Sequence, residues 1–325
     1  MTRPLSVWIL SITCTLAATT AHTSELDPRL FPYQKASGEV TGSLKCVGSD
    51  TMNNLVALWA EDFKKFYPSV QEGIEGKGSS SGPPALTEGL SIFSPMSREW
   101  KPSEIDVFKQ KHGYAPTVLL TAIDMVAIYV HKDNPLEKIS LPQLDAIYSK
   151  NRNGGIRSDI RTWGDLGLEG EWKEKPISLY GRNASSGTYG FFKNHALFKG
   201  DFKATVKEQP GSSSVVKAIS NDRFSIGYSG IGYKTPEVRA VPLAWTARDK
   251  AIPVEPVYAY RGEYPLGRFL YISLNHEPGS LLDPLRREFL RYILSADGQA
   301  IVQRDGYLPI TANIAEQAIK KVNLN

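Results

Sequence analysis

Three short clusters of Gly, Ser and Thr each follow a predicted strand and precede a predicted helix. They occupy residues 48–52, 78–82 and 185–188. A helix start leaves backbone N–H groups unpaired and carries a partial positive charge, so such a turn can hold an anion. Ser and Thr are also preferred helix caps, which explains any single cluster equally well. Three clusters on one chain favour an anion site.

Two charged residues sharpen this interpretation. Arg182 lies three residues before Ser185, and its forked guanidinium can bind two oxyanion oxygens at once. Asp124 lies inside an apolar run, and a buried carboxylate needs a partner. Asp124 is therefore either a ligand-binding acceptor or one half of an ordinary Asp–Arg ion pair.

Enzyme and metal signatures are weak. Residues 78–82 match the G-x-S-x-G pattern of serine hydrolases, but His131, His195 and His276 lie in no segment that suggests a catalytic role. Residues 214–217 match S-x-x-K without its partner motifs. The histidines are scattered, so we expect no metal site, no cofactor and no catalytic residues. A secreted serine hydrolase is the alternative from another functional class.

Apolar spacing predicts strands that alternate with helices, which is typical of mainly parallel sheets covered on both faces. Segments 256–260 and 269–274 are expected to return the chain to its first lobe. The last helix is expected to end near Gly298. The other predicted strands are 44–47, 70–76, 118–130, 177–180 and 226–228, and the other predicted helices follow Met52, Pro83, Leu141, Thr188 and Ser212.

The N-terminus predicts export. Arg3 precedes an apolar stretch over 5–16 and then small residues, which is typical of a signal peptide over 1–21 cleaved after Ala21. Residues 22–40 are polar and show no helical or strand periodicity, and we expect 22–43 to form a mobile N-terminal arm. Cleavage would leave Cys46 as the one cysteine, so no internal disulfide could form.

Composition excludes a nucleic-acid binder. The net charge is +4, and basic residues are interspersed with acidic ones as in 171–175. About 300 residues would remain after cleavage, which suits two α/β lobes.

These motifs resemble the periplasmic phosphate-binding proteins of bacterial ABC transporters, the receptors of the Pst system. The resemblance covers about residues 44–308, and the spacing of Arg182 with Ser186-Gly187-Thr188 is its most specific part. The segments that carry it are 48–52, 76–80, 96–98, 123–124, 133–135, 163–167, 182–188, 264–268 and 295–307. The resemblance implies that Thr51, Met52 through its N–H, Ser79, Arg182, Ser186, Gly187 and Thr188 contact phosphate.

The chain departs from this pattern in one segment. Some relatives have an Asp that accepts the phosphate proton where this chain has Ser97-Arg98. We therefore expect Arg98 to add a donor and Asp124 to be the acceptor. Ser80 and Ser185 stay candidates, because runs of Ser leave the contacting residue uncertain by one position.

The resemblance implies a two-lobed periplasmic binding protein fold with a hinge of two crossings. We expect lobe 1 to comprise 44–123 and 258–325, and lobe 2 to comprise 124–257. The expected partners are inorganic phosphate and an ABC permease of the inner membrane, and the protein is expected to be a periplasmic monomer. A nearer alternative is the same fold binding another oxyanion or serving a role outside transport.

Overall fold

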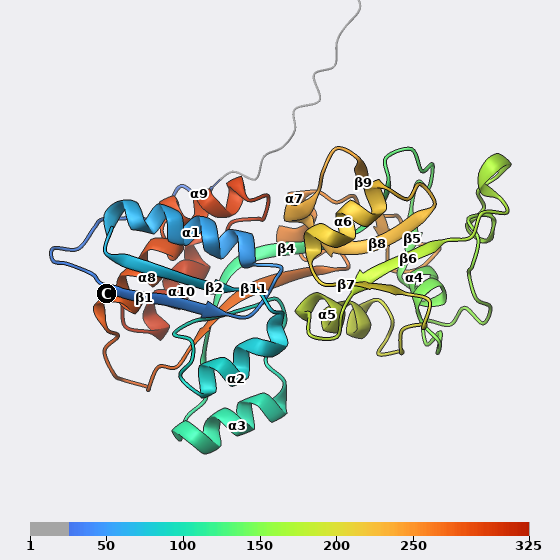
Figure 1. Ribbon diagram of the computed structural model, residues 1–325. Coiled ribbons are helices and arrows are strands. Elements are labelled where there is room, and N and C mark those ends of the chain that lie inside the picture. The colour runs from blue at the N-terminus through green and yellow to red at the C-terminus, as the bar shows by residue number, and fades with distance from the viewer. Residues whose placement is uncertain (1–25, 325) are drawn as a thin grey trace, which may run out of the picture.

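The chain folds into two α/β lobes that lie side by side and are joined by long strands (Figure 1). The computed structural model describes residues 26–324. The predicted signal peptide and its cleavage site lie outside the described residues. The two-lobed fold expected from the sequence is confirmed.

The first lobe combines the N-terminal and C-terminal parts of the chain (blue, cyan and red in Figure 1). β1 and β2 pair in parallel, and β3 pairs with the crossing strand β11. The elements of this lobe are β1 (Gly42–Val47), α1 (Asn53–Phe66), β2 (Val70–Glu75), α2 (Gly82–Thr87), β3 (Ser94–Met96), α3 (Pro102–His112), α8 (Pro284–Leu294), α9 (Ala296–Arg304) and α10 (Ala312–Lys321).

Helix α1 shows why these residues form the core of the first lobe. Leu55, Val56, Trp59 and Phe63 recur at helical spacing and are fully buried. The Trp59 indole N–H donates to the Gly298 carbonyl at 2.8 Å, so this large ring is buried without leaving its polar atom unpaired. The predicted helix after Met52 is confirmed.

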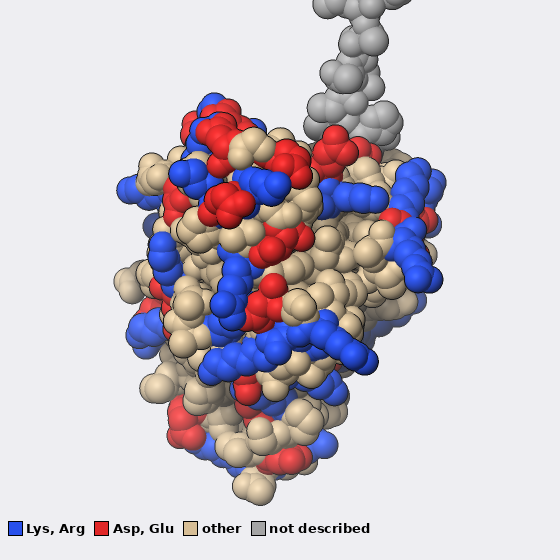
Figure 2. All heavy atoms as spheres, turned by 90° about the vertical axis from the view of Figure 1, so that its right-hand side faces the viewer, with Lys and Arg blue, Asp and Glu red and all other residues tan. Residues whose placement is uncertain are grey.

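The second lobe is formed by the middle of the chain (green to orange in Figure 1). β6 pairs in parallel with β7 and β8, and β5 pairs in parallel with β10. Its elements are β5 (Ile139–Ser140), α4 (Leu141–Tyr148), β6 (Ser178–Arg182), β7 (Lys207–Gln209), α5 (Gly187–His195), α6 (Ser212–Ser220), β8 (Ser225–Gly230), β9 (Val238–Val241), β10 (Leu243–Ala244) and α7 (Pro256–Tyr260). Figure 2 shows basic and acidic side chains intermixed on the outer face of this lobe.

Two antiparallel strands, β4 (Thr117–His131) and β11 (Gly267–Leu274), join the lobes. The first half of β4 pairs with β11, and the second half pairs with β8 and β9 of the second lobe. This register places Asp124 opposite Arg268, next to the point where β4 changes partners. The predicted strand 118–130 is therefore confirmed as the element that crosses between the lobes.

Two expectations about the C-terminal third are wrong. Residues 256–260 form helix α7, which begins at a proline and packs against the second lobe instead of returning the chain. The helix expected to end near Gly298 ends at Leu294, because the Ser295 side chain caps a new helix, and α10 follows later.

The expected mobile arm is also wrong for residues 26–40. Leu30, Tyr33 and Val40 are buried in the core of the first lobe. The Tyr33 hydroxyl donates to Glu288 Oε2 at 3.0 Å, and its ring packs edge-on against Tyr292. A few apolar residues in this polar segment are enough to anchor it, although they follow no regular period.

Tyr33→Ala tests this packing. Removing a buried aromatic ring should lower the free energy of unfolding by about 3–5 kcal/mol. Tyr33→Phe keeps the ring and loses only the hydroxyl, so it should cost about 1 kcal/mol. Urea unfolding of both variants measures the difference. Two unchanged midpoints would show that the segment contributes nothing to the first lobe.

Candidate anion-binding site

The three Gly/Ser/Thr clusters meet where the two lobes face each other. Thr51 follows β1 in the first lobe, and its Oγ1 lies 2.8 Å from the Oγ1 of Thr188 at the start of α5 in the second lobe. A Cβ added at Gly187 would lie 2.4 Å from Ser79 Oγ. The structure therefore brings Thr51, Ser79, Gly187 and Thr188 together, from both lobes.

The start of α5 is a set of backbone donors organised by Ser186. The Ser186 hydroxyl accepts from the N–H groups of Thr188 and Tyr189 at 3.1 and 3.4 Å, so this residue acts as the helix cap. The first turn of a helix carries the partial positive charge that favours an anion. Met52 precedes α1 in the first lobe, and its side chain is buried in the core.

Arg182 ends strand β6 and is almost completely buried. Its Nη1 donates to Ser212 Oγ at 2.6 Å and its Nη2 to the Pro210 carbonyl at 3.2 Å. Nη2 also lies 3.0 Å from Asp50 Oδ2, across the interface between the lobes. Nε is buried without an acceptor from the protein. Burial lowers the pKa of the guanidinium, and the charge of Asp50 opposes that shift.

Arg268 is a second buried cation in the same cluster. Its Nε and Nη2 donate to Asp124 Oδ2 at 2.9 and 2.7 Å, while Asp124 Oδ1 accepts from the Ile231 N–H at 3.0 Å. Nη1 donates to the Ser97 carbonyl at 2.8 Å and Nη2 to Thr188 Oγ1 at 2.9 Å. Asp124 is thus the carboxylate half of an ion pair, and Arg268 links that pair to both lobes.

Hydroxyl groups complete the first-lobe side of the cluster. Ser49 Oγ lies 2.9 Å and Ser79 Oγ lies 3.1 Å from Ser97 Oγ, and the Ser97 N–H donates to Ser79 Oγ at 3.0 Å. All three side chains are buried. Hydroxyls can rotate their hydrogens toward an acceptor, so these three serine side chains can redirect their hydrogen bonds toward an oxyanion.

The structure places Arg98, Ser80 and Ser185 at the edge of this cluster. The Arg98 guanidinium is held by both oxygens of Glu104 at 2.7 and 2.9 Å and reaches Ser80 Oγ at 3.4 Å. Ser185 Oγ donates to Asn183 Oδ1 at 2.7 Å. The expectation that Arg98 donates to the anion is not supported, because a carboxylate six residues away already occupies its fork.

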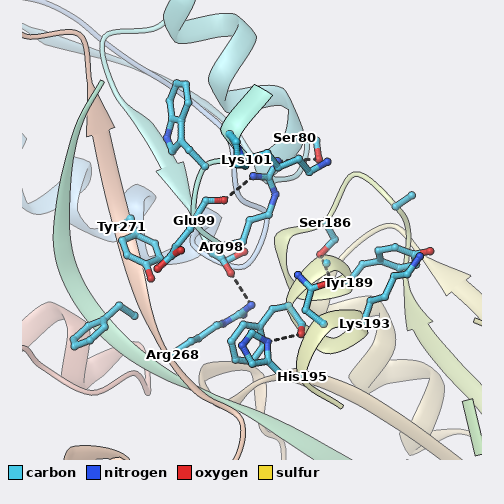
Figure 3. Close-up of a pocket in the computed structure, with 18 of the residues that line it drawn as sticks. Ser80, Arg98, Glu99, Lys101, Ser186, Tyr189, Lys193, His195, Arg268 and Tyr271 are labelled. Carbon is cyan, nitrogen blue, oxygen red and sulfur yellow. Dashed lines mark hydrogen bonds between the residues drawn. The ribbon is translucent and has the colours of Figure 1, made fainter. Parts of the chain in front are cut away.

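A cavity of about 830 Å³ lies beside the cluster, between the lobes. Ser97, Ser186 and Arg268 of the cluster line this cavity, together with other residues that include Lys101, Tyr189, Lys193 and Tyr271. Figure 3 shows Arg268 extending into this space between the two lobes. Within residues 26–324, no group of three or more His, Cys, Asp or Glu side chains could hold a metal ion.

Sequence reasoning missed five residues of the cluster, namely Ser49, Asp50, Ser97, Ser212 and Arg268. Three of these residues could have been recognised from the sequence. Ser212 follows Gly211 and starts α6, which repeats the Gly/Ser turn of the other clusters. Ser49 and Asp50 lie inside the first cluster itself. Arg268 ends segment 264–268 of the resemblance, but its role as the partner of Asp124 follows only from the pairing of β4 with β11.

Comparison with known proteins identifies the family of this chain. A family described as the PBP superfamily domain matches residues 34–297. The phosphate-binding protein PstS of Pseudomonas aeruginosa is 51% identical over 299 residues, covering 92% of each chain. PstS of Bacillus subtilis is 28% identical over 286 residues, covering 85% of this chain and 84% of its own.

Solved structures show the same fold. A putative phosphate ABC transporter substrate-binding protein from Clostridium perfringens, with bound phosphate, has a TM-score of 0.71 and 25% identity, covering 83% of this chain and 100% of its own. An ABC-type phosphate transport receptor from Vibrio cholerae has a TM-score of 0.63 and 21% identity, with 82% and 100% coverage. The chain belongs to the PstS family of phosphate-binding proteins, within the PBP superfamily.

Proposed function

We propose that this chain binds inorganic phosphate between its lobes and delivers it to an ABC permease of the inner membrane. The observation that carries the proposal is the pair of buried arginines, Arg182 and Arg268, set among hydroxyls and a helix start. Arg182 Nε is a buried donor without an acceptor from the protein, and such a group needs one. A small tetrahedral oxyanion supplies several acceptors within one cluster.

Asp124 favours phosphate over fully ionised anions. A carboxylate has about four acceptor positions, and the Ile231 N–H and the two Arg268 donors occupy three of them. The fourth can accept a hydrogen bond from protonated phosphate. Sulfate has no proton to donate at neutral pH, so its lone pairs would face this carboxylate in a water-poor site.

The cluster also requires the lobes to close. Thr51, Ser79 and Ser97 come from the first lobe, while Arg182, Gly187 and Thr188 come from the second. We propose that lobe 1 comprises 26–123 and the segment from β11 onward, and that the chain bends between the lobes at Asp124 in β4 and near Gly267 in β11. A hinge of this kind lets a ligand draw the two lobes together.

The remaining assignments follow from the proposed binding role. We propose a periplasmic, monomeric carrier without catalytic activity, since Ser79 and Ser80 bond to Ser97 and Arg98 instead of a histidine. Intermixed charges on the face in Figure 2 do not suit a nucleic acid. No helix in the described part of the chain is long and apolar enough to cross a bilayer.

Calorimetric titration of phosphate-stripped protein tests this function. Phosphate and arsenate should bind tightly, and sulfate and molybdate should not. Arg182→Ala should weaken phosphate binding by about 2–5 kcal/mol, because it removes a charged partner from a desolvated site. Arg239→Ala is the control, since this second-lobe arginine binds the Asn134 carbonyl away from the cluster.

Two results would contradict the assignment. One is a wild-type protein that binds no phosphate while binding another oxyanion, which would keep the fold but change the ligand. The other is an Arg182→Ala protein that stays folded and keeps near-normal affinity. Ester-hydrolysis activity that depends on Ser79 or Ser80 would instead support the hydrolase alternative.

Gly187→Ala tests the need for closure. The new methyl group would lie 2.4 Å from Ser79 Oγ and 2.5 Å from Ser97 Oγ, across the interface between the lobes. Relieving this overlap should cost about 1–3 kcal/mol of phosphate binding. Small-angle scattering should show less compaction on adding phosphate than in the wild type. Gly190→Ala is the matched control, because its Cβ would meet only Arg98 Cδ, at 3.7 Å. Equal behaviour of the two variants would refute the closure model.

Asp124→Asn tests selectivity. Discrimination by a site with one unsatisfied polar group can reach about 10⁴–10⁵. The amide can turn its NH₂ toward sulfate, so the preference for phosphate over sulfate should fall. Competition calorimetry measures this preference, and urea unfolding measures the cost of leaving Arg268 with a neutral partner. A loss of stability with unchanged selectivity would identify Asp124 as a structural ion-pair partner only.

A further inference from the structure

Asp50 joins the two lobes through a charged contact. It lies in the first-lobe turn next to Thr51, and its side chain is 23% exposed. Its Oδ2 lies 3.0 Å from Arg182 Nη2 and accepts from the Ser212 N–H at 2.9 Å. Both donors belong to the second lobe. The carboxylate is therefore held by a cation and by the first turn of α6, where the helix dipole favours a negative charge.

Residues Gly211 and Ser212, at the start of α6, form the binding position, or seat, of this carboxylate and let it approach closely. Gly211 precedes Ser212, and a Cβ added there would lie 3.1 Å from Asp50 Oδ1. The absence of a side chain at Gly211 thus lets the carboxylate reach the helix start. Ser212 also binds Arg182 Nη1 through its hydroxyl at 2.6 Å. The start of α6 consequently contacts both members of the pair.

We propose that Asp50 is a positioning residue that couples closure of the lobes to the orientation of Arg182. When the lobes close, the carboxylate enters the seat at the start of α6 and holds Nη2. Ser212 holds Nη1, and Nε is left without a protein acceptor. This inference rests on the proposed function, in which Arg182 binds phosphate.

The contact between Asp50 and Arg182 forms only between closed lobes, so it should affect the rate at which the ligand dissociates. Encounter with phosphate takes place before the carboxylate is seated. Breaking a charged pair of this kind mainly changes the dissociation rate. Asp50 should therefore slow phosphate dissociation while leaving association almost unchanged.

Stopped-flow kinetics of Asp50→Asn test the proposal. The amide keeps the shape and an acceptor for the Ser212 N–H but loses the charge. The dissociation rate of phosphate should rise about tenfold, with the association rate within about twofold of wild type. Asp159→Asn is the matched control. Asp159 has a side chain 22% exposed and pairs with Arg152 at 2.7 Å, entirely within the second lobe. Its substitution should change neither rate.

Other results would overturn the proposal. An unchanged or slower dissociation in Asp50→Asn would mean that the carboxylate only repels or competes with the anion. A loss confined to association would assign it to ligand capture. If the Asn variant does not fold, Asp50→Ser, which retains a short acceptor, must show the faster dissociation. Wild-type protein that fails to bind phosphate would refute the proposed function. Scattering of wild type and Asp50→Asn, each saturated with the oxyanion that does bind, would then decide the closure role, with equal compaction refuting it.

Discussion

The buried guanidinium of Arg182 is the constraint on which the cluster depends. Removing a cation from water costs several kcal/mol and is offset only by well-placed partners. Ser212 and Pro210 belong to the same lobe as Arg182, whereas Asp50 belongs to the other. The environment that makes the charge tolerable is therefore complete only when the lobes meet. Chemistry at the site and the relative position of the lobes are linked through one side chain.

The cluster achieves anion recognition without an excess of positive charge. Arg182 and Arg268 are balanced by Asp50 and Asp124. A bound anion would thus be stabilised by hydroxyls, backbone N–H groups and the start of α5, in addition to the paired cations. Such a site depends on matching hydrogen-bond donors and acceptors one by one. On the proposed function, it would distinguish anions of equal size by their protons, which a simple cationic pocket could not do.

Local patterns predicted most of the elements, and long-range pairing accounts for part of what they missed. The spacing of Leu55, Trp59 and Phe63 gave α1, and the apolar run around Asp124 gave β4. Residues 256–260 were misjudged although a proline begins α7, a signal already used correctly for α2. The Gly/Ser/Thr turns could be predicted because the residues that start a helix are adjacent in the sequence. Arg268 was missed because its role depends on the register of β11, and Arg98 was overvalued because its partner Glu104 could not be recognised from spacing alone.

The two ion pairs of the cluster differ in how they respond to motion between the lobes. Asp124 and Arg268 lie opposite each other on paired strands, β4 and β11, which both run between the lobes. Because the two strands pair with each other, we expect this ion pair to depend little on the separation of the lobes, whereas the bond from Arg268 to Thr188 joins one lobe to the other. Asp50 and Arg182 lie on elements that do not pair with each other, so their contact is lost on opening. On the proposed closure model, the Asp124–Arg268 pair is present in both states, and the Asp50–Arg182 pair forms only when the lobes are closed. A single cluster can therefore bind a small ion firmly and still release it when the lobes are forced apart.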